Sequence, residues 1–359
     1  DALGMLLRAS GMRVETFNSA QAFLNVYRPQ RAGCLLLDIR MPGMSGLDLQ
    51  DELHKRRYAI PIIFLTGHGD VPLAVRALKR GAIDFIEKHC FDENGRMYFS
   101  VTAEGKPLRM RRYVFSETFA AIAMSEYALA TGEQKYAERA LQIFKDTQRF
   151  LTTPGILAPK FEESVQLQSH SIIMILINVA SCIRKVINDP KLTEQIDESI
   201  AKLKKYFIHP EFKCLLETVG MNGEFVDTCM GRTINPGHCI ETSWFILDVA
   251  KQRGWDKEIT DMALQIFDWS WDWGWDKQYG GIINFRDCRN LPVQDYSQDM
   301  KFWWPQTETI IASLYAYLAT GDDEYNYKHQ RISEWTYAHV PDAEIGEWYG
   351  YLHRNGTVA

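Results

Sequence analysis

An internal repeat of eight residues constrains the fold more than any other feature of the sequence. Residues 129–136 read LATGEQKY, and residues 318–325 read LATGDDEY, 189 positions later. Each copy follows one apolar-periodic stretch and precedes another, so the glycine is expected to end one helix and the tyrosine to pack in the next. Repeats of this kind are typical of chains built from stacked helical hairpins.

The helical periodicity predicts four hairpins at a regular spacing. They cover residues 110–151, 164–207, 237–275 and 302–340, roughly 64 residues apart, so that 189 residues correspond to three steps. Residues 192–207 carry one apolar stripe, as an outer helix would, whereas residues 172–180 are apolar all round, as an inner helix would be. This alternation indicates a mainly α toroid of inner and outer helices.

Residues 1–88 have a different pattern. Short apolar runs predict buried strands at 34–37, 60–65 and 82–86, and amphipathic stretches at 47–53 and 71–78 predict helices between them. Strands that alternate with helices form a parallel sheet covered on both faces. The net charge also changes, from +3 over residues 1–88 to −9 over residues 89–359. We therefore expect two domains that join at about Lys88.

Three functional side chains follow the predicted strands of this first domain. The Asp38 carboxylate could take up a phosphoryl group, and the Thr66 hydroxyl and the Lys88 ammonium could bind its oxygens. Each residue taken alone could simply cap a strand. The three occur together with the motifs LDIRMPGMSG (37–46) and LTGHGD (65–70), which makes the signal more specific.

On these motifs, residues 1–88 resemble the receiver domain of bacterial response regulators, a flavodoxin-like α/β fold. The resemblance implies that Asp38 is the phosphoacceptor, Thr66 the switch hydroxyl, Phe85 the switch aromatic and Lys88 the phosphate-binding lysine. It also implies a sensor histidine kinase as partner and Mg²⁺ at the phosphorylation site. The family's first strand with its acidic pair, and its last helix, are missing from this segment, so Asp38 is the one Mg²⁺ ligand that can be named.

The helical part contains two clusters with chemical potential. His238 opens a predicted helix after Asn-Pro-Gly, and Glu241 shares its face three residues later, so the carboxylate could orient the imidazole for acid–base catalysis. The same pair could equally be a structural hydrogen bond. Trp303, Trp304 and Glu308 would suit a sugar, whose C–H face stacks on aromatic rings, although both tryptophans could instead belong to the core.

Residues 89–359 resemble the N-acylglucosamine 2-epimerase family, which includes cellobiose and mannose epimerases and ketol isomerases. The motifs that carry the resemblance are RYVFS (112–116), PGH (236–238) with Glu241 and Trp244, WDKQYGG (275–281), WWP (303–305) with Glu308, and EWYGY (347–351). They occur in the family's order and at matching intervals. The family fold is an (α/α)₆ barrel, of which this chain holds eight of twelve helices and so an incomplete barrel.

The resemblance implies the following site. His238 is one of two catalytic histidines, Glu241 and Glu308 position substrate or catalytic groups, and Trp304 stacks on the sugar. His170, at the start of the all-apolar inner helix, lines the site. Two further motif residues, Trp303 and Tyr113, are taken as substrate contacts.

The implied reaction inverts C2 of an N-acylhexosamine or related aldose. The sugar ring opens, a base removes the proton next to the aldehyde carbon, an enediolate forms, and reprotonation on the other face completes the inversion. No cofactor is required. The Arg-bearing first inner helix and the second catalytic histidine of the family lie outside these 359 residues, so we expect little 2-epimerase activity.

Composition excludes several other classes. The charge pattern has no basic cluster beyond residues 55–57, which argues against nucleic acid as a partner. No apolar run reaches the length of a membrane span, and there is no signal peptide pattern. Seven scattered cysteines without a C-x-x-C pair read as reduced thiols of a cytoplasmic, bacterial protein. The remaining histidines lack partners at ligand spacing, so no metal is predicted in the helical part. The sequence leaves the oligomeric state open, with a homodimer as one alternative.

Three functions stay open at this point: a carbohydrate epimerase or isomerase, a signalling protein in which phosphorylation of Asp38 gates the helical part, and a non-catalytic sugar-binding protein. The expected join between Lys88 and His89 falls inside both families' domains, and no linker rich in proline, glycine or serine separates the two parts. A non-functional chimera of the two families is therefore as good an explanation as a functional fusion.

Overall fold

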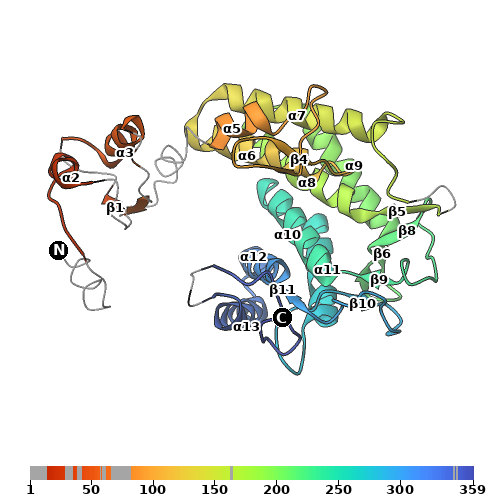
Figure 1. Cartoon of the computed structure of the whole chain (residues 1–359). Helices are drawn as coiled ribbons and strands as arrows, with labels where there is room; N and C mark the ends of the chain where they lie inside the picture. The colour runs from red at the N-terminus through yellow and green to blue at the C-terminus, as the bar shows by residue number, and fades with distance from the viewer. Residues whose placement is uncertain are drawn as a thin grey trace. The chain divides into compact units, whose positions relative to one another are not determined.

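The structure is a computed structural model that describes residues 14–28, 35–38, 43–56, 58, 62–65, 82–161, 165–342, 344 and 347–359. The chain divides into two compact units (Figure 1). The first comprises Asp1–Met110 with Tyr127–Glu133, and the second comprises Arg111–Glu126 with Gln134–Ala359. Each unit is described by itself.

The first unit contains a parallel pair of short strands with helices beside it. Its elements are α2 (Ala20–Val26), β1 (Leu35–Asp38), α3 (Gly46–Lys55), β2 (Ile62–Leu65), α5 (Ala82–His89), β3 (Ser100–Val101) and β4 (Pro107–Arg109). β1 and β2 are parallel, with Leu35 opposite Ile62 and Asp38 opposite Leu65. Phe23, Leu24, Tyr27, Leu37, Leu49 and Leu53 form a buried cluster. The strands predicted at 34–37 and 60–65 and the helix predicted at 47–53 are confirmed. Thr66 and the helix predicted at 71–78 lie outside the described residues.

The predicted third strand at 82–86 is wrong. These residues begin helix α5, in which Ile83 is buried and Ile86 is partly buried, and Cys90, directly after the helix, is buried as well. Positions 83, 86 and 90 follow helical spacing, and a short apolar run by itself does not distinguish a strand from a buried helix. Phe85 and Lys88 therefore lie on a helix: the Phe85 ring packs against His89 at 5.0 Å, and the Lys88 side chain is exposed.

The helical part consists of four consecutive helix pairs, and all four predicted hairpins are confirmed. They are α6 (Phe115–Thr131) with α7 (Gln134–Thr152), α8 (His170–Arg184) with α9 (Pro190–Tyr206), α10 (Pro236–Gln252) with α11 (Lys257–Gly274), and α12 (Trp303–Thr320) with α13 (Asp323–His339). The repeated glycines end their helices as expected: Gly132 follows α6 at φ 71° and Gly321 follows α12 at φ 70°, a left-handed conformation that favours glycine.

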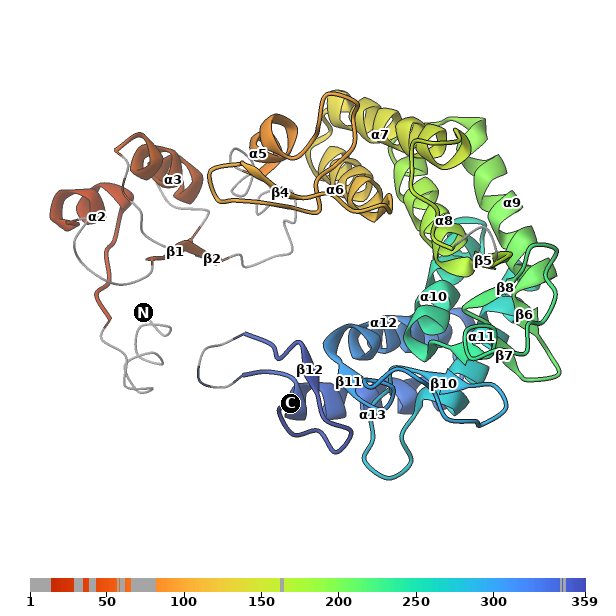
Figure 2. The same ribbon diagram turned by 45° about the vertical axis from the view of Figure 1, so that its right-hand side comes forward.

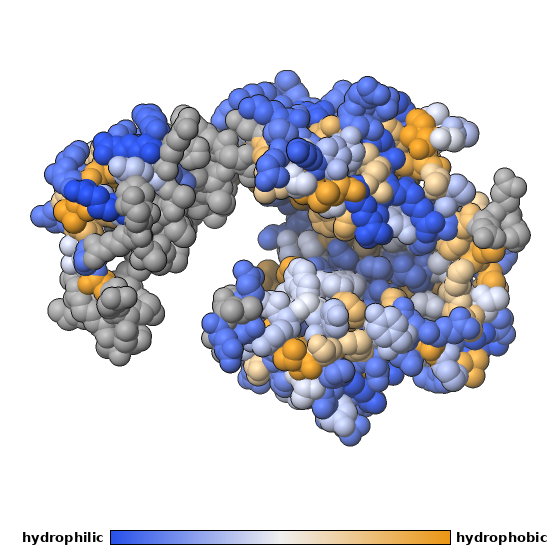
Figure 3. Space-filling view, in the orientation of Figure 1, coloured by the Kyte–Doolittle hydropathy of each residue, from blue (hydrophilic) through white to orange (hydrophobic). Residues whose placement is uncertain are grey.

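The hairpins of the second unit form an inner and an outer layer. α10 packs against both α8 and α12, whereas α9, α11 and α13 pack against the inner helix of their own pair (Figure 2). α8 is buried over almost its whole length, while α9 buries one stripe that includes Leu192, Ile196 and Leu203. Over these hairpins, orange apolar patches are small and separated by hydrophilic areas on the face drawn in Figure 3. No helix among the described residues has the length and apolarity to cross a bilayer.

Short antiparallel strand pairs lie between the hairpins of the second unit. They are β5 (Leu167–Ser169) with β8 (Thr218–Gly220), β6 (Ile208–His209) with β7 (Cys214–Leu215), β9 (Thr233–Ile234) with β10 (Arg286–Asp287), and β11 (Lys301–Phe302) with β12 (Tyr351–Leu352). β5, β9 and β11 lead directly into the inner helices α8, α10 and α12. The linking segments and the starts of the inner helices therefore lie at the same end of the unit.

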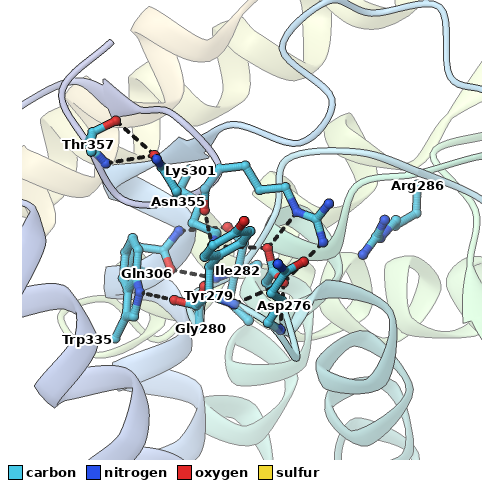
Figure 4. Close-up of polar contacts among 12 residues, drawn as sticks. Asp276, Tyr279, Gly280, Ile282, Arg286, Lys301, Gln306, Trp335, Asn355 and Thr357 are labelled. Carbon is cyan, nitrogen blue, oxygen red and sulfur yellow. Dashed lines mark hydrogen bonds and ion pairs between the residues drawn. The ribbon is translucent and has the colours of Figure 1, made fainter.

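A buried ion pair fixes three of these linking segments to one another (Figure 4). Asp276 is 1% exposed, and its carboxylate accepts hydrogen bonds from Lys301 Nζ at 3.3 Å and from Arg354 Nε at 2.8 Å. The Lys301 ammonium is fully buried and also donates to the carbonyl oxygens of Gly280 and Arg354. The segment after α11, the start of α12 and the C-terminal segment are thus joined through one lysine.

We expect Lys301→Met to lower the free energy of unfolding by about 3 kcal/mol, because it leaves buried oxygen acceptors without their donor. Chemical denaturation followed by tryptophan fluorescence measures this change. The control is Lys202→Met on the exposed side of α9, which should leave the stability within about 0.5 kcal/mol of the wild type. Equal effects of the two substitutions would show that the ammonium does not hold these segments together.

Candidate active site

A single carboxylate, Glu217, lies between the starts of two inner helices. It occupies the linker between β7 and β8, where its backbone carbonyl accepts the amide of His170 at 3.2 Å and its own amide donates to Thr233 at 3.1 Å. The first of these bonds ties Glu217 to the first residue of α8, and the second ties it to β9, which leads into α10. The Glu217 side chain is 16% exposed.

The start of α10 is shaped so that His238 points toward this carboxylate. Asn235 caps the helix by accepting the His238 amide at 3.1 Å, and Pro236 occupies the first turn, where its missing N–H costs nothing. A Cβ on Gly237 would come within 2.8 Å of the Trp304 ring, so glycine allows α12 to approach. The His238 and Trp304 rings lie 5.1 Å apart.

Two imidazoles face Glu217. The His238 Nδ1 is 3.0 Å from Glu217 Oε2, a hydrogen bond, and the His170 Nδ1 is 3.6 Å from the same oxygen. Within the described residues, neither ring nitrogen of the fully buried His170 has a hydrogen-bond partner. The rings of His170 and His238 are 6.0 Å apart.

These contacts set the charge of each group. Burial opposes ionisation of Glu217, but the charges of His238 and His170 outweigh it and lower the pKa to about 2. Burial also acts against protonation of His238, yet the charge and hydrogen bond of Glu217 raise its pKa above the ordinary value. Burial lowers the pKa of His170 to about 4, so this ring is neutral at pH 7. Because Glu217 is ionised and accepts from Nδ1–H, the Nε2 lone pair of neutral His238 is left for chemistry.

Glu217, rather than the predicted Glu241, is the carboxylate that orients His238. The sequence reasoning missed it because the partners are 21 residues apart and belong to different elements. One signal was available: Glu217 is the only charged residue within the otherwise apolar stretch CLLETVG (214–220). A carboxylate in a buried strand-like run usually has a specific partner.

Glu241 and Glu308 form a second carboxylate pair at the same place. Glu308 Oε2 accepts a hydrogen bond from the Trp244 indole at 2.6 Å. Burial and the charge of Glu308 raise the pKa of Glu241 to about 8, and burial raises the pKa of Glu308. Glu241 is therefore mostly protonated at neutral pH and can donate a proton, while the neutral form of His238 can accept one. An acid and a base side by side are the two groups that a proton transfer at carbon uses.

The other candidate residues occupy separate positions. Trp303 opens α12 and is 46% exposed, whereas Trp304 is half-buried beside His238. Tyr113 precedes α6, where its hydroxyl accepts from Arg112 at 2.9 Å and its ring packs against Phe115. Asp38 ends β1 in the first unit.

The described residues also contain one group that could hold a metal ion. His170, Glu217 and His238 offer ligand atoms that all lie within 4.8 Å of one another. Two imidazoles and a carboxylate form a donor set that suits zinc. Two of the three, His238 and Glu217, are also joined by the hydrogen bond described above.

Two family models match the chain. Residues 67–359 match the model for N-acylglucosamine 2-epimerase, and residues 1–97 match the model for the response regulator receiver domain. The N-acylglucosamine 2-epimerase of Bos taurus is 30% identical over 268 residues, which cover 73% of this chain and 63% of that protein. The response regulator protein TmoT of Ectopseudomonas mendocina is 53% identical over 94 residues, 26% of this chain and 43% of that protein. This chain thus spans less than two thirds of the length of the curated epimerases that it matches.

Solved structures show the same helical fold. The cellobiose 2-epimerase from Bacillus thermoamylovorans superposes with a TM-score of 0.68 at 21% identity, covering 81% of this chain and 79% of its own. A sugar epimerase from a ruminal bacterium superposes with a TM-score of 0.67 at 20% identity, covering 80% of this chain and 75% of its own. The expectation of a mainly α barrel of hairpins, preceded by a receiver-like segment, is confirmed.

The raised pKa of Glu241 predicts how stability depends on pH. The folded state holds this proton up to about pH 8, whereas the unfolded chain releases it near 4.5, so stability falls as the pH rises between these values. Glu241→Gln removes the ionisation, and we expect it to be more stable than the wild type above pH 8 by about 2–4 kcal/mol. Denaturant titrations at pH 5 and pH 8.5 measure the difference. Glu258→Gln, on an exposed side chain of α11, is the control; parallel pH curves for the wild type and Glu241→Gln would contradict the prediction.

Proposed function

Because the chain belongs to the N-acylglucosamine 2-epimerase family, we propose that it transfers a proton at C2 of an N-acylhexosamine or related aldose. The observation that carries this proposal is the hydrogen bond of His238 to the ionised Glu217, with the protonated Glu241 close by. A base strengthened by a carboxylate and an adjacent carboxylic acid are the two groups that enolisation needs.

The steps follow from the protonation states. On the ring-opened sugar, His238 Nε2 takes the proton from C2, and the electrons of the C–H bond move toward the carbonyl oxygen to give an enediolate. Glu241 is placed to protonate or hydrogen-bond that oxygen. Return of a proton to the opposite face of C2 gives the epimer. For an aldose, protonation of C1 and of its oxygen, with loss of the proton of the C2 hydroxyl, gives the ketose. Because only protons move, the proposal includes no organic cofactor.

Substrate contacts come from the aromatic and polar residues around His238. Trp304 lies against the His238 ring and offers a face for the C–H side of a sugar. Glu308, held by the Trp244 indole, is an acceptor for sugar hydroxyls. The neutral His170 completes the wall, and Trp303 and Tyr113 are proposed as outer contacts.

A second candidate function is favoured by the receiver match over residues 1–97. We propose Asp38 as phosphoacceptor for a sensor histidine kinase, with Mg²⁺ as the ion it would help to bind; Thr66, Phe85 and Lys88 are the proposed switch and phosphate-binding residues. The proposed domain boundary at Lys88/His89 lies within residues 67–97, which both family models match. A cytoplasmic location is part of the proposal, and the six cysteines in the described part of the chain are free thiols.

For the enzymatic proposal, we expect deuterium from D₂O to enter C2 of N-acetylmannosamine or mannose, measured by NMR on the recovered sugar. His238→Ala should lower the exchange rate by about 100-fold or more, because it removes the base. In Glu217→Gln the pKa of His238 falls, so the rise of rate with pH should shift to lower pH. His353→Ala, at an exposed position, is the control. Exchange that persists in His238→Ala would exclude this mechanism, and the sugar formed distinguishes epimerisation from isomerisation.

For the signalling proposal, we expect acetyl phosphate with Mg²⁺ to add one phosphoryl group to the chain, visible by mass spectrometry. Asp38→Asn should abolish the modification, because the amide oxygen cannot form the acyl phosphate. Asp48→Asn, on α3, is the matched control and should still be modified. Modification of Asp38→Asn to the wild-type extent would rule out Asp38 as phosphoacceptor.

A further inference from the structure

A cavity of about 540 Å³ lies away from the His238 cluster. Its walls come from the β6–β7 turn, the end of α11, the segment after α11, the loop that follows β10, and Arg354. It shares no lining residue with the set formed by His170, Glu217, His238, Glu241 and Glu308. The proposed proton transfer therefore leaves this cavity unused.

The cavity carries an excess of positive charge. Four basic side chains line it, Lys213, Lys277, Arg286 and Arg354, against the two carboxylates of Asp272 and Asp276. Asp276 is already neutralised, because it is bonded to both Lys301 and Arg354. The cavity therefore has the electrostatic character of an anion site.

Arg286 is the partly buried basic side chain of the cavity that, among the described residues, has no carboxylate partner, whereas Lys213 and Lys277 are exposed and Arg354 is paired with Asp276. Its Nε donates to the Trp273 carbonyl at 3.1 Å, and within the described residues its guanidinium makes no ion pair. Figure 4 shows the guanidinium directed toward the Asp276 region, where Arg354 already occupies the carboxylate. Burial and the neighbouring Arg354 lower the pKa of Arg286 and outweigh the opposing effect of the Asp276 and Asp299 charges. An anion bound beside the guanidinium would make a charge-assisted hydrogen bond to it.

Aromatic rings form the rest of the wall. Trp269 and Trp273 are partly exposed, and Trp273 is held in place because its indole N–H donates to the carbonyl of Lys213 at 3.0 Å. Trp275 is stacked on Trp271 at 4.6 Å. Rigid indole faces beside cations suit a ligand that presents both a C–H face and an anionic group.

We propose that this cavity binds an anionic sugar, that is, a monosaccharide ring bearing a phosphate or a carboxylate. The acidic group pairs with Arg286, with Lys277 and Lys213 adding positive charge at the rim. The sugar ring lies against Trp273 and Trp269. The site is distinct from the proton-transfer site and does not depend on His238.

The test is isothermal titration calorimetry of the whole chain with glucose 6-phosphate, glucuronate, glucose and inorganic phosphate. We expect the two anionic sugars to bind, and glucose and phosphate each to bind at least tenfold more weakly. Arg286→Gln should weaken the binding of glucose 6-phosphate by at least tenfold. Arg289→Gln, three residues away and paired with Asp227 outside the cavity, should leave it unchanged.

Three outcomes would overturn the proposal. The first is the absence of binding by either anionic sugar while circular dichroism shows the chain to be folded. The second is inorganic phosphate that binds as tightly as glucose 6-phosphate, which would leave no role for the sugar ring. The third is loss of binding in His238→Ala with retention in Arg286→Gln, which would place the ligand at the proton-transfer site. Binding that survives His238→Ala supports this cavity whether or not the chain exchanges the C2 proton.

Discussion

The buried charge of Glu217 is the feature on which the geometry of the candidate site depends. A carboxylate that is 16% exposed is costly unless cations or hydrogen-bond donors surround it. Here the donor is the imidazole of His238, the third residue of α10, and the ring of His170, the first residue of α8, lies 3.6 Å from the same oxygen, so both helix starts come to the same point. The backbone of Glu217 forms hydrogen bonds to the same two regions, and these bonds fix the position of the residue that carries the carboxylate.

One small region thus holds carboxylates in opposite protonation states. Glu217 faces two imidazoles and is ionised, whereas Glu241 faces the carboxyl group of Glu308 and is mostly protonated at neutral pH. The difference between the two pKa values comes from the neighbouring charged groups rather than from the extent of burial, because both side chains are largely removed from water. Trp244 contributes by bonding Glu308, which holds the second carboxyl group close enough to affect Glu241. The proposed acid and base thus come from neighbouring groups that act on each other's pKa values.

The sequence was sufficient for the parts of the fold that local rules control. The hairpins follow from helical periodicity and from glycines such as Gly132 and Gly321, which end helices through backbone conformation alone. The run at 82–86 was misread because five apolar-rich residues satisfy both a strand and a buried helix, and only packing decides between them. Glu217 was missed for a related reason: its partners are 21 and 47 residues away, and no local pattern records such a contact.

The cation-rich cavity and the His238 cluster are separate, yet they share one framework. A Cβ on Gly274, at the end of α11, would meet Pro236 at 2.7 Å, so the helix that carries Trp269 and Trp273 touches the first residue of α10 directly. Pro236 in turn stands two residues before His238. Beyond α11, Asp276 is bonded to the buried Lys301 of β11, which leads directly into α12, and α12 supplies Trp304 and Glu308. The packing that gives the cavity its wall therefore also sets the positions of the His238 imidazole and of its acidic neighbours.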